Sequence, residues 1–250
     1  MAHWLRDRGF DAYAVTGGVH ALLGAPPPEA PAEKRDRSRD WKAGASALRH
    51  RRFQIYFGGV LLSLAGSWVE AGAFGYVVLL LGGSAATLGI IGFLNTIPNL
   101  VFALPAGVLA DHFDRRKLLL LFQGGNMGVA VALTVLWASG HLTVFLMGLL
   151  AFIGGTLGSL SFPAFQSMLA GTVPEEDLES AVALNSLALQ VARFVGPAIA
   201  GVLLASAGPT WVFGLNAFSF LAVLGALALL PSSRARIAAA PVRFECAVRQ

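Results

Sequence analysis

The middle of this 250-residue chain has few charged residues. A soluble domain usually carries about 25% charged residues, whereas the whole chain has 13%. Between Phe53 and Leu230 the charged residues are Glu70, Asp111, Asp114, Arg115, Arg116, Lys117, Glu175, Glu176, Asp177, Glu179 and Arg193. This deficit excludes an ordinary soluble domain over these residues.

Cysteine is nearly absent as well, since Cys246 is the only one in the sequence. An intramolecular disulfide is therefore excluded. The five histidines are scattered, and the sequence has no His and Cys cluster with metal-ligand spacing, no nucleophile beside a base and no phosphate loop. We expect no enzyme activity, no catalytic residue, no cofactor and no metal site.

Long apolar stretches fill the region that lacks charge. A helix needs about 20 apolar residues to cross a bilayer, and six stretches reach that length. The predicted spans cover residues 53–81, 88–110, 118–139, 142–170, 178–205 and 211–230. The fold class that follows is an all-α membrane protein of six transmembrane helices, with the lipid bilayer as its surroundings.

The connections between these spans alternate in charge. Those around Gly83, Gly140 and Gly208 carry none, whereas the other two connections and the flanks of the spans carry the charges. The basic flanking residues are Arg49, Arg51, Arg52, Arg234 and Arg236. Because Lys and Arg are retained on the cytoplasmic side, both termini are expected in the cytoplasm. The same asymmetry explains the net charge of +4 better than a nucleic-acid partner does.

The charged connection between the second and third spans resembles the signature loop of the major facilitator superfamily. The sequence GVLADHFDRRK places Gly107, Asp111, Phe113, Arg115 and Arg116 at matching positions. Lys117 completes the basic end of the loop, and His112 and Asp114 depart from the pattern. An Asp at position 114 is typical of the branch of exporters similar to the enterobactin exporter.

The fifth predicted span resembles the antiporter motif of drug and proton exchangers at Gly196, Pro197 and Gly201. The resemblance implies efflux of a small amphipathic solute by alternating access across the bacterial inner membrane. The fourth span lacks an Arg that many proton-coupled members carry, so proton coupling stays open. By resemblance, the signature loop locks the cytoplasmic ends of two halves together.

Members of that superfamily have twelve spans in two halves, and this chain resembles the N-terminal half. A second six-span half or a homodimer would then be needed as partner. The alternative is a truncated or remnant membrane protein without transport of its own.

The two ends of the chain have different compositions from the spans. Residues 1–24 resemble the end of a rhodanese-like domain, and residues 25–52 read as a linker rich in proline and charge. The spans form a domain over residues 53–230. Residues 231–250 resemble the cytoplasmic segment before a seventh span, and the chain is expected to be truncated there.

Three polar residues inside the predicted spans are candidates for solute contact or coupling. A charge within a span costs about 2.5–3.5 kcal/mol on insertion scales, so Glu70 and Arg193 are expected to face the bundle interior or a wet cavity. Their similar depths allow an ion pair between them. Asn95 is the third candidate, although most amides in spans form interhelical hydrogen bonds.

Overall fold

The computed structural model describes residues 45–230, apart from the side chain of Asp111, and every long element in that range is a helix. The elements are η1 (Ser46–Arg49), α4 (Arg51–Leu80), α5 (Ala85–His112), α6 (Arg115–Ala138), α7 (Val144–Ala170), η2 (Glu175–Asp177), α8 (Leu178–Ser206) and α9 (Pro209–Leu229). The six α-helices are long and apolar enough to cross a membrane. The predicted six-span, all-α fold is confirmed.

Helices continue through most of the charged connection between the second and third spans. Asp111 and His112 end α5, and Arg115 begins α6, so only two residues form the turn. Asp114 precedes α6, and its Oδ1 accepts a hydrogen bond of 3.0 Å from the backbone N–H of Arg116. This N-cap satisfies a donor that the first turn would otherwise leave free.

The three uncharged connections share a glycine with positive φ. Gly82, Gly140 and Gly208 have φ values of 79°, 72° and 80°, and each lies just after the end of a helix. A left-handed residue at this position turns the chain away while its N–H caps the last carbonyls. All three connections can therefore reverse direction within a few residues.

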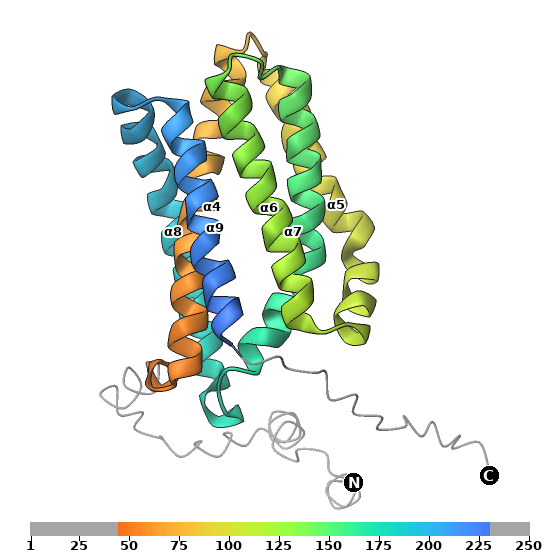
Figure 1. Cartoon of the computed structure of the whole chain (residues 1–250), viewed down its shortest axis with the longest axis vertical. Coiled ribbons are helices and arrows are strands. Elements are labelled where there is room, and N and C mark those ends of the chain that lie inside the picture. The colour runs from red at the N-terminus through yellow and green to blue at the C-terminus, as the bar shows by residue number, and fades with distance from the viewer. Residues whose placement is uncertain (1–44, 231–250) are drawn as a thin grey trace, which may run out of the picture. The chain divides into compact units, whose positions relative to one another are not determined.

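The six helices divide into two groups (Figure 1). One group contains α4, α8 and α9, and the other contains α5, α6 and α7. Packing between α6 and α9 joins the groups, whereas α4 touches α5 only slightly and α7 touches α8 only slightly. The two groups are therefore held together mainly by α6 and α9.

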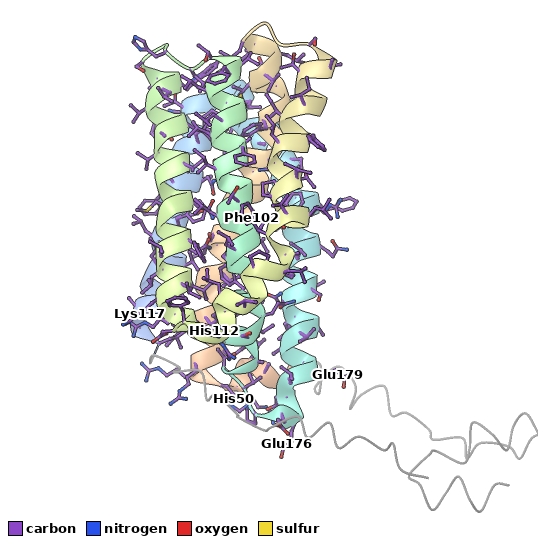
Figure 2. The ribbon with its side chains drawn as sticks, turned by 90° about the vertical axis from the view of Figure 1, so that its right-hand side faces the viewer. His50, Phe102, His112, Lys117, Glu176 and Glu179 are labelled. Carbon is purple, nitrogen blue, oxygen red and sulfur yellow. The ribbon has the colours of Figure 1, made fainter. Side chains whose placement is uncertain are left out.

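Charged residues gather at one end of the bundle. Figure 2 shows His50, His112, Lys117, Glu176 and Glu179 at this end, where α4 begins and α9 ends. Many large apolar side chains are exposed along the rest of the bundle, and Leu104 and Phe194 are 85% and 88% exposed. Exposed apolar area of this extent is what a lipid-facing surface requires.

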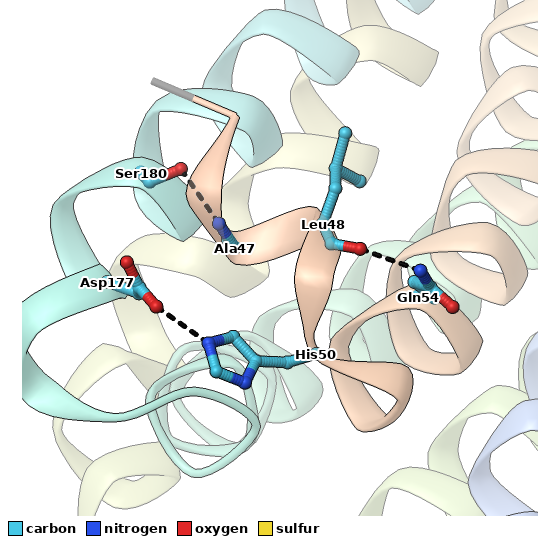
Figure 3. A network of polar contacts seen from close by, with 6 residues as sticks. All are labelled: Ala47, Leu48, His50, Gln54, Asp177 and Ser180. Atoms are coloured by element: carbon cyan, nitrogen blue, oxygen red, sulfur yellow. Dashed lines mark hydrogen bonds and ion pairs between the residues drawn. The ribbon is translucent and has the colours of Figure 1, made fainter. Parts of the chain in front are cut away.

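A network of polar contacts fastens η1 to the beginning of α8 (Figure 3). The backbone N–H of Ala47 donates to Oγ of Ser180 at 3.2 Å. Nε2 of His50 lies 2.6 Å from Oδ2 of Asp177. We call these two contacts the η1–α8 clasp; they place the start of the first span beside the start of the fifth.

Some predicted segments lie outside the described residues. They are the rhodanese-like fragment at 1–24, the linker up to residue 44, and the segment 231–250 with Cys246.

Candidate functional site

A cavity of about 940 Å³ lies between the helices, and all six spans contribute to its wall. Its volume is at the upper end of the range of about 300–1,000 Å³ that is usual for small-molecule sites. The polar side chains in its wall are Tyr56, Ser63, Ser67, Glu70, Asn95, Gln123, Asn126, Gln166, Asn185, Ser186 and Asn216. An apolar wall with polar groups from every helix suits an amphipathic solute.

Glu70 is the charged side chain of this wall among the described residues. Its Oε2 accepts a hydrogen bond of 2.7 Å from Nδ2 of Asn216, which lies on α9 and is buried. Oγ of Ser67 and Oγ of Ser219 lie 3.4 and 3.3 Å from Oδ1 of the same amide, and each hydroxyl also donates to a backbone oxygen, of Ser63 at 3.0 Å and of Asn216 at 2.7 Å. The amide is thus held with its N–H side toward the carboxylate.

Two other amides of the wall, Asn95 and Asn126, donate hydrogen bonds within the bundle. Nδ2 of Asn95 donates to the backbone oxygen of Ala151 at 3.0 Å, which ties α5 to α7. Nδ2 of Asn126 donates to Oε1 of Gln123 at 3.3 Å, one turn away on α6. Asn95 therefore serves in helix packing and also faces the cavity.

Several of these residues were not among the predicted site residues. Asn216 is intramembrane and polar, but nothing in its sequence context indicates that it meets Glu70. Gln123 and Asn126 carry a recognisable signal, because two amides three residues apart in an apolar stretch lie on one helix face. Tyr56 gives no such signal; its hydroxyl donates to the backbone oxygen of Phe165 at 3.0 Å.

Arg193 does not pair with Glu70, and the predicted ion pair is wrong for this structure. The guanidinium lies over the ring of Trp68, 5.5 Å from its centroid, and Arg193 is not in the cavity wall. Among residues 45–230 no ion pair reaches Glu70. Glu70 and Arg193 nevertheless lie at similar depths. Trp68 and Gly72, on either side of Glu70 in α4, pack against α8 at Gly196 and Pro197, close to Arg193.

The helical face is what separates the two charges. Successive residues of an α-helix turn by about 100°, so Trp68 and Glu70 point about 160° apart on α4. Trp68 faces α8, whereas Glu70 faces α9. Equal depth therefore brings Arg193 to the opposite side of α4 from the carboxylate.

The signature loop lies away from the cavity, at the charged end. Nη2 of Arg116 donates to the backbone oxygen of Ala228 at 2.7 Å, in the last turn of α9. A cation suits this position because carbonyl groups at the end of a helix lack partners. Gly107 lies inside α5, Lys117 is exposed on α6, and the side chain of Asp111 is outside the described part.

The antiporter-like residues form the contact between α4 and α8. A Cβ at Gly196 would lie 2.7 Å from the carbonyl carbon of Trp68, and a Cβ at Gly72 would lie 2.6 Å from Cα of Pro197. Gly201 differs, because a Cβ there meets nothing within 4 Å. Gly196 and Pro197 thus allow close approach of two spans.

Residues 45–230 contain no group of three His, Cys, Asp or Glu side chains that could hold a metal ion.

The comparison with protein families matches residues 42–250 to the family described as "Transmembrane secretion effector".

Similar proteins are bacterial transporters. The chain is 29% identical over 178 residues to the staphyloferrin A transporter of Staphylococcus aureus, covering 70% of this chain and 45% of that protein. It is 28% identical over 196 residues to the enterobactin exporter EntS of Salmonella choleraesuis, covering 76% and 46%. It is 31% identical over 188 residues to the multidrug efflux pump Tap of Mycobacterium bovis, covering 71% and 43%. The chain spans about half the length of these curated relatives.

Proposed function

Because the chain belongs to the transmembrane secretion effector family of the major facilitator superfamily, we propose that it exports a small amphipathic solute by alternating access. The observation that carries this proposal is the cavity, which has Glu70 and amides from several spans in an otherwise largely apolar wall. A solute site at the midplane between bundled spans is the usual design of such transporters. Glu70 is the residue that we assign to solute contact.

Proton exchange is the proposed driving force. Glu70 can carry either a proton or a charge, and the cavity gives it access to solute and water. Efflux should then stop when a protonophore collapses the proton gradient. Efflux that persists without the gradient would contradict this coupling.

A second six-span bundle is proposed to complete the transport path. It would come from a second copy of the chain or from a separate second half, since the relatives are about twice as long as the part matched here. The alternative function is that of a membrane protein without transport of its own. Light scattering of the purified chain gives its oligomeric state, and efflux by cells that express the chain alone separates the two functions.

The orientation proposed for the exporter has the charged end of the bundle in the cytoplasm. Reporter fusions after Gly83, Gly140 and Gly208 should then read as external, because those connections lack Lys and Arg. Cytoplasmic signals at two of the three positions would reverse the orientation. The bacterial inner membrane is the proposed location.

Filling the cavity tests the export function. Gly158 lies in the cavity wall, and a Cβ there meets nothing within 4 Å. Gly158→Leu should therefore fold and reduce efflux of fluorescent solutes from a strain that lacks its own pumps. Gly128→Leu is the matched control, because that glycine of α6 is also free of close contacts but lies outside the cavity wall. Equal efflux by both variants would contradict export through this cavity.

A further inference from the structure

The charges around the cavity have one sign. Glu70 lies in the wall, and no Lys, Arg or His of the described residues does. The cation nearest in depth, Arg193, lies over Trp68 on the other side of α4. A solute in this cavity therefore meets a negative group and no positive group from this part of the chain.

The Glu70 carboxylate has less compensation than a charge at this depth needs. One amide N–H reaches it, at 2.7 Å, and no cation of residues 45–230 lies within ion-pair distance. Burying an ionised carboxylate is expensive unless it is both paired and hydrogen-bonded. A positively charged solute would supply the missing partner.

The rest of the wall indicates what kind of cation fits. The aromatic side chains around the cavity are Tyr56, Phe74, Phe162, Phe165 and Phe220. Aromatic faces attract cations and also cover apolar surface. Amide groups beside them can accept or donate hydrogen bonds. This combination suits an organic cation with a large apolar body better than a small inorganic ion.

We propose that the exported solute is an amphipathic organic cation whose positive group lies at the Glu70 carboxylate, a proposal that rests on the function proposed above. An anion of the same size would face the same carboxylate with no compensating charge. The sign of the solute charge is thus set by Glu70, while the aromatic and amide groups contribute affinity for either sign.

A matched pair of ions tests the proposal. Tetraphenylphosphonium and tetraphenylborate have nearly the same shape and opposite charges. The purified 250-residue chain, reconstituted in nanodiscs of neutral lipid, should bind the phosphonium more tightly by about tenfold or more. Empty nanodiscs give the lipid background. Equal binding, preference for the borate, or binding of neither ion would overturn the proposal.

Variants separate the charge of Glu70 from its structural role. Glu70→Gln should remove the preference for the cation, while Glu70→Asp should keep it because the charge remains. Asp114→Asn should also keep the preference, since Asp114 caps α6 outside the cavity wall. Gel filtration checks that each variant is folded. An unchanged preference in a folded Glu70→Gln variant would overturn the proposal, as would its loss in Asp114→Asn.

The chain can export solutes even if those solutes are not cations. A chain that prefers the borate, yet loses efflux in Gly158→Leu and keeps it in Gly128→Leu, is still an exporter. In that case the sign of the solute charge is set by residues outside the wall described here.

Discussion

The two sides of α4 hold their neighbouring helices in different ways. Toward α8, contact is made by the small residues Gly72 and Gly196, and the polar group Arg193 lies over an aromatic ring. Toward α9, Gly59 and Gly66 also allow close approach, but a hydrogen-bonded group joins the helices where Glu70 meets Asn216. One helix can thus carry a packing interface and a polar interface at the same depth. The difference shows that depth in the bilayer does not by itself decide what a charged residue meets.

The α8 side should be sensitive to added volume. Gly196→Ala places a Cβ 2.7 Å from the backbone of Trp68, so the helices must separate. Overpacking of this kind costs about 1–3 kcal/mol. Gly201→Ala gains the same helix propensity without a contact, so the difference between the two variants isolates the clash. Thermal unfolding in detergent measures it, and equal melting temperatures would contradict close packing at Gly196.

The α9 side should be the more sensitive to loss of a hydrogen bond. Asn216→Leu leaves Glu70 without its donor, and an unsatisfied buried polar group costs about 1–3 kcal/mol. Adding Glu70→Leu should recover part of that loss, because both partners are then apolar. Asn99→Leu is the control, since Asn99 is exposed and makes no side-chain hydrogen bond to residues 45–230. If Asn216→Leu and Asn99→Leu lower the melting temperature equally, the polar interface contributes nothing to stability.

The contact between Arg193 and Trp68 should contribute less. A cation over an aromatic ring is worth about 0.5–1 kcal/mol at an exposed site. A double-mutant cycle with Arg193→Gln and Trp68→Leu should return a favourable coupling of this size. The cycle removes the packing change that each single variant introduces. A coupling of zero would mean that the ring only borders the guanidinium.

The smallest effect is expected between the two intramembrane charges themselves. Glu70 and Arg193 share no partner among the described residues. A cycle with Glu70→Gln and Arg193→Gln should therefore be additive within about 0.5 kcal/mol. Recovery of stability in the double variant would show that the charges meet in a conformation different from this one.

The number and length of the spans were predictable, because bilayer thickness fixes how many apolar residues a helix needs. The fifth span shows how close this comes: residues 178–205 were expected and α8 is Leu178–Ser206. The spans beside the signature loop were expected to end at residue 110 and to begin at residue 118. In the structure α5 continues to His112, and Asp114 caps α6, which begins at Arg115. Local capping chemistry thus corrected a boundary that hydropathy alone placed less well.

The partners of polar side chains were not predictable in the same way. The hydropathy of α4 indicates that Glu70 faces away from lipid, but it does not indicate which neighbouring side chain contacts the carboxylate. That choice depends on how α4 is rotated, and the rotation is set by glycines such as Gly66 and Gly72 that determine which faces touch. The sequence therefore allowed Arg193 as a partner of Glu70, whereas the structure places Asn216 there.

The η1–α8 clasp has a consequence for the order in which the protein is assembled. Its halves are far apart in the chain: His50 and Asp177 are separated by 127 residues. At 5–20 residues per second, roughly 6–25 s of synthesis separate them. The segment before the first span therefore leaves the ribosome long before its partner exists, and it can dock only when the beginning of the fifth span has been made. Closure of the clasp marks a late stage of membrane insertion, after four spans have already been synthesised.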